Sequence, residues 1–144
     1  MLSRLAIAAA ACLAPLAGAA PPTPLPVLPA SFAWGQPPGL PGVRGAWVLG
    51  AEKHEGLYAF RVELAAGARL PPHTHPDTRY STVLSGTLYV GFGERVDEAA
   101  MVAVPAGAVY VAPAGQPHYL YARDGAVVYQ EGGLGPTATI PLPR

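Results

Sequence analysis

Four histidines occur in the sequence, and three of them fall in two short segments whose spacing suits metal binding. His73 and His75 are two positions apart, so on an extended strand both imidazoles project from the same face. His118 lies far downstream and must reach the same place from a different strand. Imidazole is a common ligand for Zn, Cu, Fe and Ni. We therefore expect His73 and His75 to share one divalent transition metal, either Fe, Mn, Ni, Cu or Zn, with His118 as a candidate third ligand.

The residues around these histidines favour a rigid arrangement. Pro71, Pro72 and Pro76 fix the backbone on both sides of the His-Thr-His segment and keep the preceding residues extended. One alternative is a rigid loop that binds no metal. For His118 the alternative is a buried histidine bonded to a neighbouring tyrosine, although side-chain parity on a regular strand opposes it. His54 lies in a polar loop segment, which is typical of an exposed histidine.

Glycines and prolines recur at fixed offsets around the three histidines, and these offsets carry a family resemblance. Two segments resemble the first and second conserved motifs of the cupin superfamily: Gly67 to Gly86 with His73-Thr-His75, and Gly107 to His118 with Pro113-Ala-Gly115. The motifs cover residues 67–118, and the flanking apolar strands extend the resemblance over about 43–140. The chain is also similar to small exported bacterial cupins that carry a His-Thr-His-Pro-Asp segment.

Two positions depart from the cupin pattern. Arg79 stands where cupins usually carry a metal-binding Glu, and Ala122 stands where the second motif usually ends in Asn. The Arg79 side chain could turn outward, pair with Asp77 or another acid, or bind an anionic ligand as a planar fork. With its neighbour Tyr80, it is our candidate for substrate binding. Asp77 is a candidate additional metal ligand, although Asp in such a turn commonly caps its own backbone.

The resemblance implies a barrel with a small-molecule site, and two functional classes follow. A three-histidine site leaves open metal positions, as in some cupin dioxygenases. This favours a metal-dependent oxygenase or lyase that acts on a small anionic organic molecule. The alternative is a non-catalytic module that senses or binds a carbohydrate, an anion or another small ligand, because the cupin fold serves many functions. The sequence identifies no catalytic residue, and whether the protein is an enzyme stays open.

The hydrophobic pattern predicts an all-β domain over residues 43–144. Residues 57–64 alternate, with Tyr58, Phe60, Val62 and Leu64 on one face, and further short strands follow at the spacing typical of a barrel or sandwich. Ser85-Gly86 between two apolar runs predicts a hairpin. The segment 94–100 is polar enough for a short helix or a surface loop, and the proline-containing tail predicts an edge strand. We expect a single double-stranded β-helix, which is a jelly-roll barrel.

Two segments precede this domain. Residues 1–19 have the pattern of a signal peptide, with Arg4 before an apolar run that is too short to span a bilayer. We expect export to the periplasm or the outside of the cell. Cys12 raises a lipoprotein anchor as a minor alternative. Residues 20–42 are rich in proline and predict an extended lead-in, held against the barrel by Phe32 and Trp34.

Charge and surface patterning limit the expected partners. Nine basic and nine acidic residues balance, and no basic run occurs, so we expect neither a nucleic-acid partner nor stable membrane insertion. We expect a homodimer, because the apolar faces of residues 58–64 and 80–92 exceed what a small barrel can bury.

Overall fold

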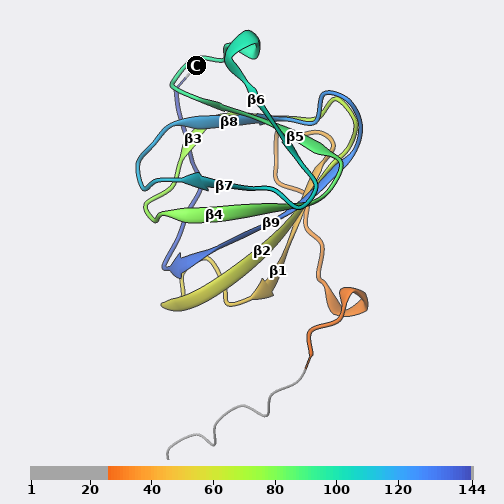
Figure 1. Ribbon diagram of the computed structural model, residues 1–144. Helices are drawn as coiled ribbons and strands as arrows, with labels where there is room; N and C mark the ends of the chain where they lie inside the picture. The colour runs from red at the N-terminus through yellow and green to blue at the C-terminus, as the bar shows by residue number, and fades with distance from the viewer. Residues whose placement is uncertain (1–25, 144) are drawn as a thin grey trace, which may run out of the picture.

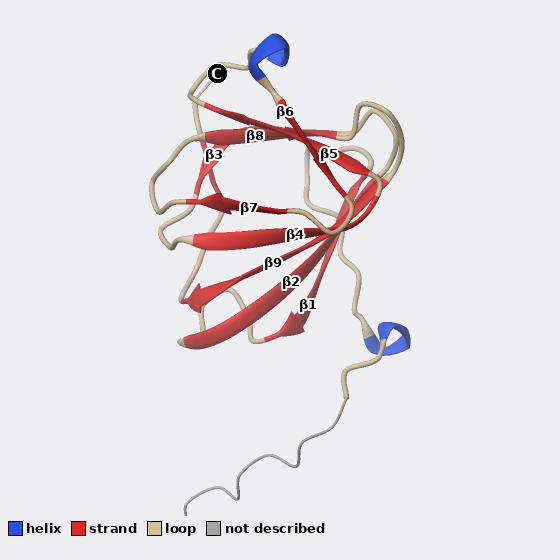
Figure 2. Ribbon diagram, viewed as in Figure 1, coloured by secondary structure: helices blue, strands red, loops and turns tan. Residues whose placement is uncertain are grey.

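The computed structural model describes residues 26–143, in which ten strands form two five-stranded antiparallel sheets that face each other (Figures 1 and 2). The first sheet contains, in spatial order, β1 (Val43–Leu49), β2 (Gly56–Leu64), β9 (Val127–Gly135), β4 (Arg79–Ser85) and β7 (Val109–Ala112). The second sheet contains β10 (Ile140–Pro141), β3 (Arg69–Thr74), β8 (His118–Tyr121), β5 (Thr87–Phe92) and β6 (Val102–Pro105). Two short 3-10 turns, η1 (Pro29–Ser31) and η2 (Glu98–Ala100), complete the described elements. The predicted all-β jelly roll is confirmed.

The core lies between the two sheets and is made by alternate residues of their strands. Val83, Leu88, Leu120 and Val127 are each 1% exposed or less. The alternating face of β2 also points inward, with Tyr58 4% exposed and Leu64 1% exposed. This corrects one basis for the expected homodimer, because the face over residues 58–64 is core and not a subunit surface. By strand alternation, several exposed apolar side chains of the first sheet lie on its outer face instead, among them Leu57, Tyr80, Val109, Val111 and Leu134.

The hairpin expected at Ser85-Gly86 is wrong. Strand β4 pairs with β7 and β9, whereas β5 pairs with β6 and β8, so the two strands belong to different sheets. Gly86 has a φ of 77°, and a Cβ there would lie 2.4 Å from the carbonyl oxygen of Ala126. The glycine therefore forms a tight corner where the chain crosses from one sheet to the other.

The described part of the proline-rich segment lies against the first sheet. Arg44 stacks over the Trp34 ring at 4.7 Å, and Arg61 lies 5.3 Å from the centre of the Phe32 ring. A bridge between Gly35 and Gly45 fixes the segment beside β1. The predicted signal peptide and Cys12 lie outside the described residues. Over residues 26–143, no helix has the length and apolar character needed to cross a membrane.

The C-terminal segment crosses from the first sheet to the second. After β9 ends at Gly135, the chain forms β10, which pairs with β3 at the edge of the second sheet (Figure 1). In this pairing Ile140 lies opposite Thr74 and Pro141 lies opposite His73. The predicted edge strand is therefore confirmed, and it brings residues 137–139 beside the His-Thr-His segment.

Candidate metal centre

The structure brings the three predicted histidines together between the sheets. His73 lies in β3, His75 follows that strand, and His118 begins β8, directly opposite His73 in the register. The ring centres are 4.9 Å apart for His73 and His75, 4.3 Å for His73 and His118, and 5.0 Å for His75 and His118. All three residues are at most 4% exposed. His54, by contrast, lies in an exposed loop.

One nitrogen from each ring lies within 4.8 Å of the other two, and these three histidines form the only metal-suited group of this kind among residues 26–143. Bonds of about 2.0–2.1 Å from imidazole to Zn place three nitrogens of one ion about 3.3–3.6 Å apart. The three nitrogens, which lie within 4.8 Å of one another, therefore have to approach by up to about 1.5 Å to share an ion.

Each ring is oriented by a backbone carbonyl that accepts a hydrogen bond from Nδ1. His73 donates to Pro71 O at 2.7 Å, His75 to Ala138 O at 2.8 Å, and His118 to Gln116 O at 3.1 Å. A carbonyl only accepts, so the proton of each neutral ring lies on Nδ1 and the lone pair lies on Nε2. The Nε2 atoms of His75 and His118 are buried and have no hydrogen-bond partner. This is how metal-binding histidines are commonly held, with the second nitrogen fixing the ring.

The surroundings also keep the rings neutral. Burial, helped by His118, lowers the pKa of His73 to about 4. Burial and then the positive charge of Arg79 lower the pKa of His75 to about 3. The pKa of His118 is lowered as well, chiefly by burial. At neutral pH the cluster therefore offers unprotonated nitrogen, the form that binds metals, and the three residues fit a divalent transition metal.

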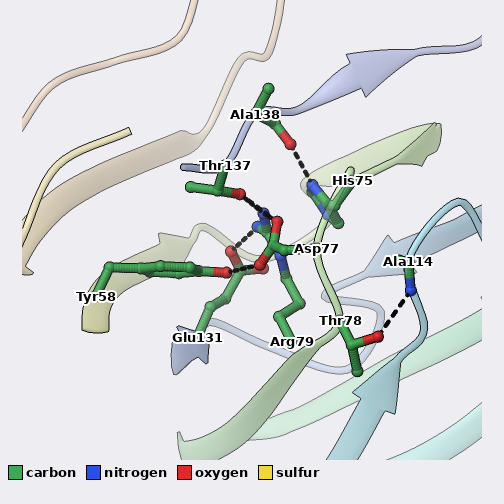
Figure 3. A network of polar contacts seen from close by, with 9 residues as sticks. All are labelled: Tyr58, His75, Asp77, Thr78, Arg79, Ala114, Glu131, Thr137 and Ala138. Atoms are coloured by element: carbon green, nitrogen blue, oxygen red, sulfur yellow. Dashed lines mark hydrogen bonds and ion pairs between the residues drawn. The ribbon is translucent and has the colours of Figure 1, made fainter. Parts of the chain in front are cut away.

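Arg79 lies inside the barrel, paired with acids on two sides. It is 4% exposed, and its guanidinium donates to Glu131 Oε2 at 2.7 Å and to Asp77 Oδ1 at 3.1 Å (Figure 3). A third hydrogen bond goes to the Thr137 hydroxyl. Of the three roles that the sequence left open for Arg79, this geometry matches pairing with acids. Its role in substrate binding stays a prediction.

Asp77 belongs to this charge network and not to the histidine cluster. Its Oδ1 accepts hydrogen bonds from Arg79 and Thr137, and its Oδ2 accepts one from the Tyr58 hydroxyl at 2.5 Å. Burial alone would raise the pKa of Asp77, but the hydrogen bonds from Thr137 and Tyr58 and the Arg79 charge lower it. The carboxylate that we considered as an additional ligand is thus held by three other side chains.

Tyr80 is not brought to the cluster. Its neighbours Arg79 and Ser81 point into the barrel, so by strand alternation the Tyr80 side chain lies on the outer face, where it is 56% exposed. Its ring covers the backbone of Gly132 on the adjacent strand β9. A substrate-binding role for Tyr80 stays a prediction, and it would act on the outside of the sheet.

Sequence reasoning did not assign a role to Glu131, Thr137 or Ala138. Glu131 lies two and four positions after the buried residues Tyr129 and Val127, so strand alternation places it on the same inward face of β9. A charged residue at such a core position is the sequence feature that could have identified it. Burial raises the pKa of Glu131, although Arg79 opposes the shift. No signal in the sequence identified Thr137 and Ala138, because their contacts to Arg79 and His75 span about sixty positions.

A small cavity opens beside the histidines. It has a volume of about 160 Å³, and His73 and His75 form part of its wall. Most of the remaining lining is apolar, including Phe60, Val62 and Leu70, and Glu131 is the one acidic residue in it. Such a mostly apolar space with a few convergent polar groups is typical of a small-molecule site.

Comparison with known proteins agrees with this geometry. The cupin domain family matches residues 60–129, which include all three histidines. Germin-like protein 3-1 of Oryza sativa subsp. japonica is 37% identical over 73 residues, which are 50% of this chain and 32% of that protein. The chain spans less than half the length of the curated relatives it matches.

Solved structures share the same architecture. The polyketide cyclase RemF from Streptomyces resistomycificus superposes with a TM-score of 0.71 at 14% identity, over 85% of this chain and 87% of that one. Oxalate oxidase in complex with the substrate analogue glycolate reaches a TM-score of 0.51 at 26% identity, over 60% of this chain and 46% of that one. The chain therefore contains a cupin domain over residues 60–129, and its fold is shared with these solved structures.

Proposed function

We propose that this protein is a metal-dependent cupin enzyme that binds one divalent transition metal through His73, His75 and His118. The observation that carries the proposal is the protonation pattern of the cluster. Each ring donates Nδ1–H to a carbonyl, and the Nε2 atoms of His75 and His118 are buried without a partner. Leaving a buried acceptor unpaired costs about 1–3 kcal/mol. A bound metal would offset this cost, and no other group in the described chain does so.

The donor set indicates what chemistry a bound ion would supply. Three imidazole ligands leave positions open on the ion, so it can act as a Lewis acid and hold a substrate in those positions. The protein ligands are neutral, so they leave the ionic charge uncompensated. Asp77 and Glu131, the nearby acids, are each bound to Arg79.

The cavity favours a small organic substrate. Its volume of about 160 Å³ suits a molecule of a few heavy atoms, and its apolar walls exclude water around the reacting groups. Only Oε2 of Glu131 accepts a hydrogen bond from the described residues. The carboxylate is therefore placed to accept a hydrogen bond or a proton from a substrate in the cavity, and we assign it the role of candidate general base.

We retain the proposed reaction class, oxygenase or lyase, with a small anionic molecule as substrate. The similarity to an oxalate oxidase crystallised with glycolate supports a small oxygen-rich anion. The structure changes the reason for expecting an anion, since Arg79 is paired with two carboxylates and its charge is no longer available to an anionic substrate. An anionic substrate would thus be attracted by the metal, whose charge no protein ligand offsets.

A non-catalytic ligand-binding module is the second candidate. The feature that favours it is the state of the acids, because Asp77 and Glu131 both pair with Arg79 and neither is a free carboxylate. In that case the same cavity would hold a ligand at the metal without turnover.

Metal content and turnover separate these candidates. We would purify the protein without a His-tag, measure bound metals by elemental analysis, and reconstitute it with Fe, Mn, Ni, Cu and Zn in turn. One ion per chain is expected. Oxygen uptake or substrate loss with oxalate and glycolate would support the enzyme, and saturable binding without turnover would support the module. A wild-type protein that stays metal-free after every reconstitution would contradict both.

Export and dimer formation are further proposals. Export is supported by the pattern of residues 1–19, and N-terminal sequencing of protein from a cell envelope fraction would test cleavage after Ala19. A homodimer is now supported by the exposed apolar side chains on the outer face of the first sheet, among them Leu57 and Leu134. Light scattering at micromolar concentration would test it, and a monomer mass would contradict it.

A further inference from the structure

His75 differs from the other two histidines in what orients its ring. His73 and His118 donate to carbonyls only two residues away, at Pro71 and Gln116, so their own loops hold them. His75 donates to the carbonyl of Ala138, which is 63 positions away in the C-terminal segment. The direction of the His75 ring therefore depends on where a distant piece of the chain is held.

That piece of the chain is anchored at the residue immediately before Ala138. Thr137 is 7% exposed, and its backbone N–H donates to Glu52 O at 2.7 Å. Its hydroxyl accepts a hydrogen bond from Arg79 and donates one to Asp77 (Figure 3). One hydroxyl thus uses both its acceptor and its donor capacity inside the charge network.

The network that holds Thr137 is itself tied to the first sheet. Tyr58 of β2 donates to Asp77, and Glu131 of β9 accepts from Arg79. Two fixed strands therefore determine where the Thr137 hydroxyl lies, and through it where the Ala138 carbonyl meets His75 (Figure 3). Arg79 occupies the position of the usual cupin metal-binding Glu, and it is connected to the candidate metal site through this chain of contacts.

We propose that Arg79, Asp77 and Thr137 form a positioning clamp that sets the His75 ring for metal binding by holding the Ala138 carbonyl. The inference rests on the proposed metal-binding function. The clamp keeps the Nδ1–H tautomer of His75 and aims Nε2 at the other two rings. Because the remaining two histidines are oriented locally, loss of the clamp weakens the metal site without removing it. Substitution of such outer partners typically lowers metal affinity about 10–100-fold.

Thr137→Val tests the clamp with little change in side-chain volume. We expect this variant to bind Co²⁺ and Zn²⁺ about 10–100-fold more weakly in chelator competition. The visible absorption spectrum of the Co²⁺ form should also change, because one ligand becomes poorly oriented. Thr137→Ser keeps a hydroxyl and should restore most of the affinity and the spectrum. Thr87→Val, at the end of β5 opposite to the residue that pairs with His118, is the matched control and should behave as wild type.

The outcomes separate this inference from the proposed function. If wild type binds no metal, the proposed function fails, and the clamp inference fails with it. If wild type binds metal and Thr137→Val has the same affinity and the same Co²⁺ spectrum, the clamp is overturned while the metal site stands.

A measurement on the unaltered protein avoids any folding defect of the variant. In the metal-free wild type, long-range ¹H–¹⁵N spectra report the tautomer of each imidazole. The clamp requires the Nδ1–H tautomer for His75, and an Nε2–H tautomer there would overturn it.

Discussion

The histidine cluster and the charge network of Asp77, Arg79 and Glu131 lie next to each other in the barrel, and their polar groups are satisfied in opposite ways. In the cluster, each ring is held through Nδ1, while the Nε2 atoms of His75 and His118 are buried and unpaired. In the network, each charged side chain has an oppositely charged partner within 3.1 Å. The cluster presents acceptor atoms to a ligand, whereas the charges of the network are paired within the protein and only Nε of Arg79 is left without a hydrogen-bond partner among its guanidinium nitrogens.

This difference explains why an arginine can occupy a ligand position next to a candidate metal site. A lone guanidinium about 6 Å from a divalent ion would be repelled by about 5 kcal/mol at an effective dielectric of 20. Two carboxylates beside Arg79 more than balance its charge, so that the network as a whole does not repel a cation. Cupins usually carry a metal-binding Glu at the position of Arg79. Here the neighbouring strand contributes an acid, Glu131, and this acid pairs with Arg79.

The largest expected effect is on metal binding when a cluster ligand is removed. His75→Ala should lower metal affinity by about 1000-fold or more, since each of the few ligands carries a large share of a binding energy of about 10–16 kcal/mol. The barrel should stay folded, because the apolar core carries its stability. Elemental analysis and thermal unfolding would check both points. Full metal content in His75→Ala would place the metal elsewhere.

The second prediction addresses the network. Arg79→Met leaves Asp77 and Glu131 buried without a countercharge and should cost about 3–5 kcal/mol of unfolding free energy. Arg79→Glu restores the residue type usual at this cupin position. Here it would place three carboxylates together, so it should destabilise more than Arg79→Met. Urea unfolding at pH 7 would measure both variants.

A matched control for the network is the exposed pair of Arg44 and Glu63, which also joins neighbouring strands. The side chains of this pair are 55% and 29% exposed. Arg44→Met should cost about 1 kcal/mol or less, because exposed ion pairs contribute little. Equal losses of unfolding free energy in Arg44→Met and Arg79→Met would show that burial of the network has no energetic consequence.

These two regions also show how far the sequence could predict the site. Spacing placed His73 and His75 on one face of a strand, and the resemblance to the paired cupin motifs added His118, which lies on a different strand. The partners of Arg79 depend on which strands lie side by side, and β4 and β9 are joined through residues 52 positions apart. Parity along a strand indicates that Glu131 is buried, but it does not identify its partner.

The same limit applies to the fold. Period-two alternation over residues 57–64 predicted strand β2 and its inward face correctly, since it reports which residues face the core. It does not report the sheet to which a strand belongs, and for this reason Ser85-Gly86 was predicted as a hairpin although it is a corner between sheets. Two-residue links of this kind look alike in sequence, and only the long-range pairing distinguishes them.

The third prediction concerns the pH dependence of stability, which tests whether the histidine cluster is kept neutral. The folded state lowers the pKa of His73 to about 4 and that of His75 to about 3. A lowered pKa means that stability is present above the unfolded value of about 6.5 and is lost as the pH falls. Metal-free protein should therefore lose about 4–6 kcal/mol of unfolding free energy between pH 7 and pH 4.

Two features of the network bear on this pH dependence. The lowered pKa of Asp77 adds to the loss at the acid end, and the raised pKa of Glu131 opposes it. Urea unfolding at several pH values, after dialysis against a chelator, would measure the slope. A slope that is flat from pH 7 to pH 4 would mean that the cluster is not held neutral by burial.

The smallest effect is expected at Tyr80, which lies on the outer face of the sheet that carries the network. Its ring covers Gly132, where a Cβ would come within 2.7 Å of the tyrosine ring, so the aromatic side chain shields a bare stretch of β9 backbone. Removing a half-exposed ring of this kind in Tyr80→Ala should cost about 0.5–1 kcal/mol of stability, the range for a cross-strand pair. Metal affinity should stay the same, since strand alternation places Arg79 inside and Tyr80 outside. If Tyr80→Ala lowered metal or ligand affinity as much as Thr137→Val, the outer face of the sheet would belong to the binding site together with the cluster and the network.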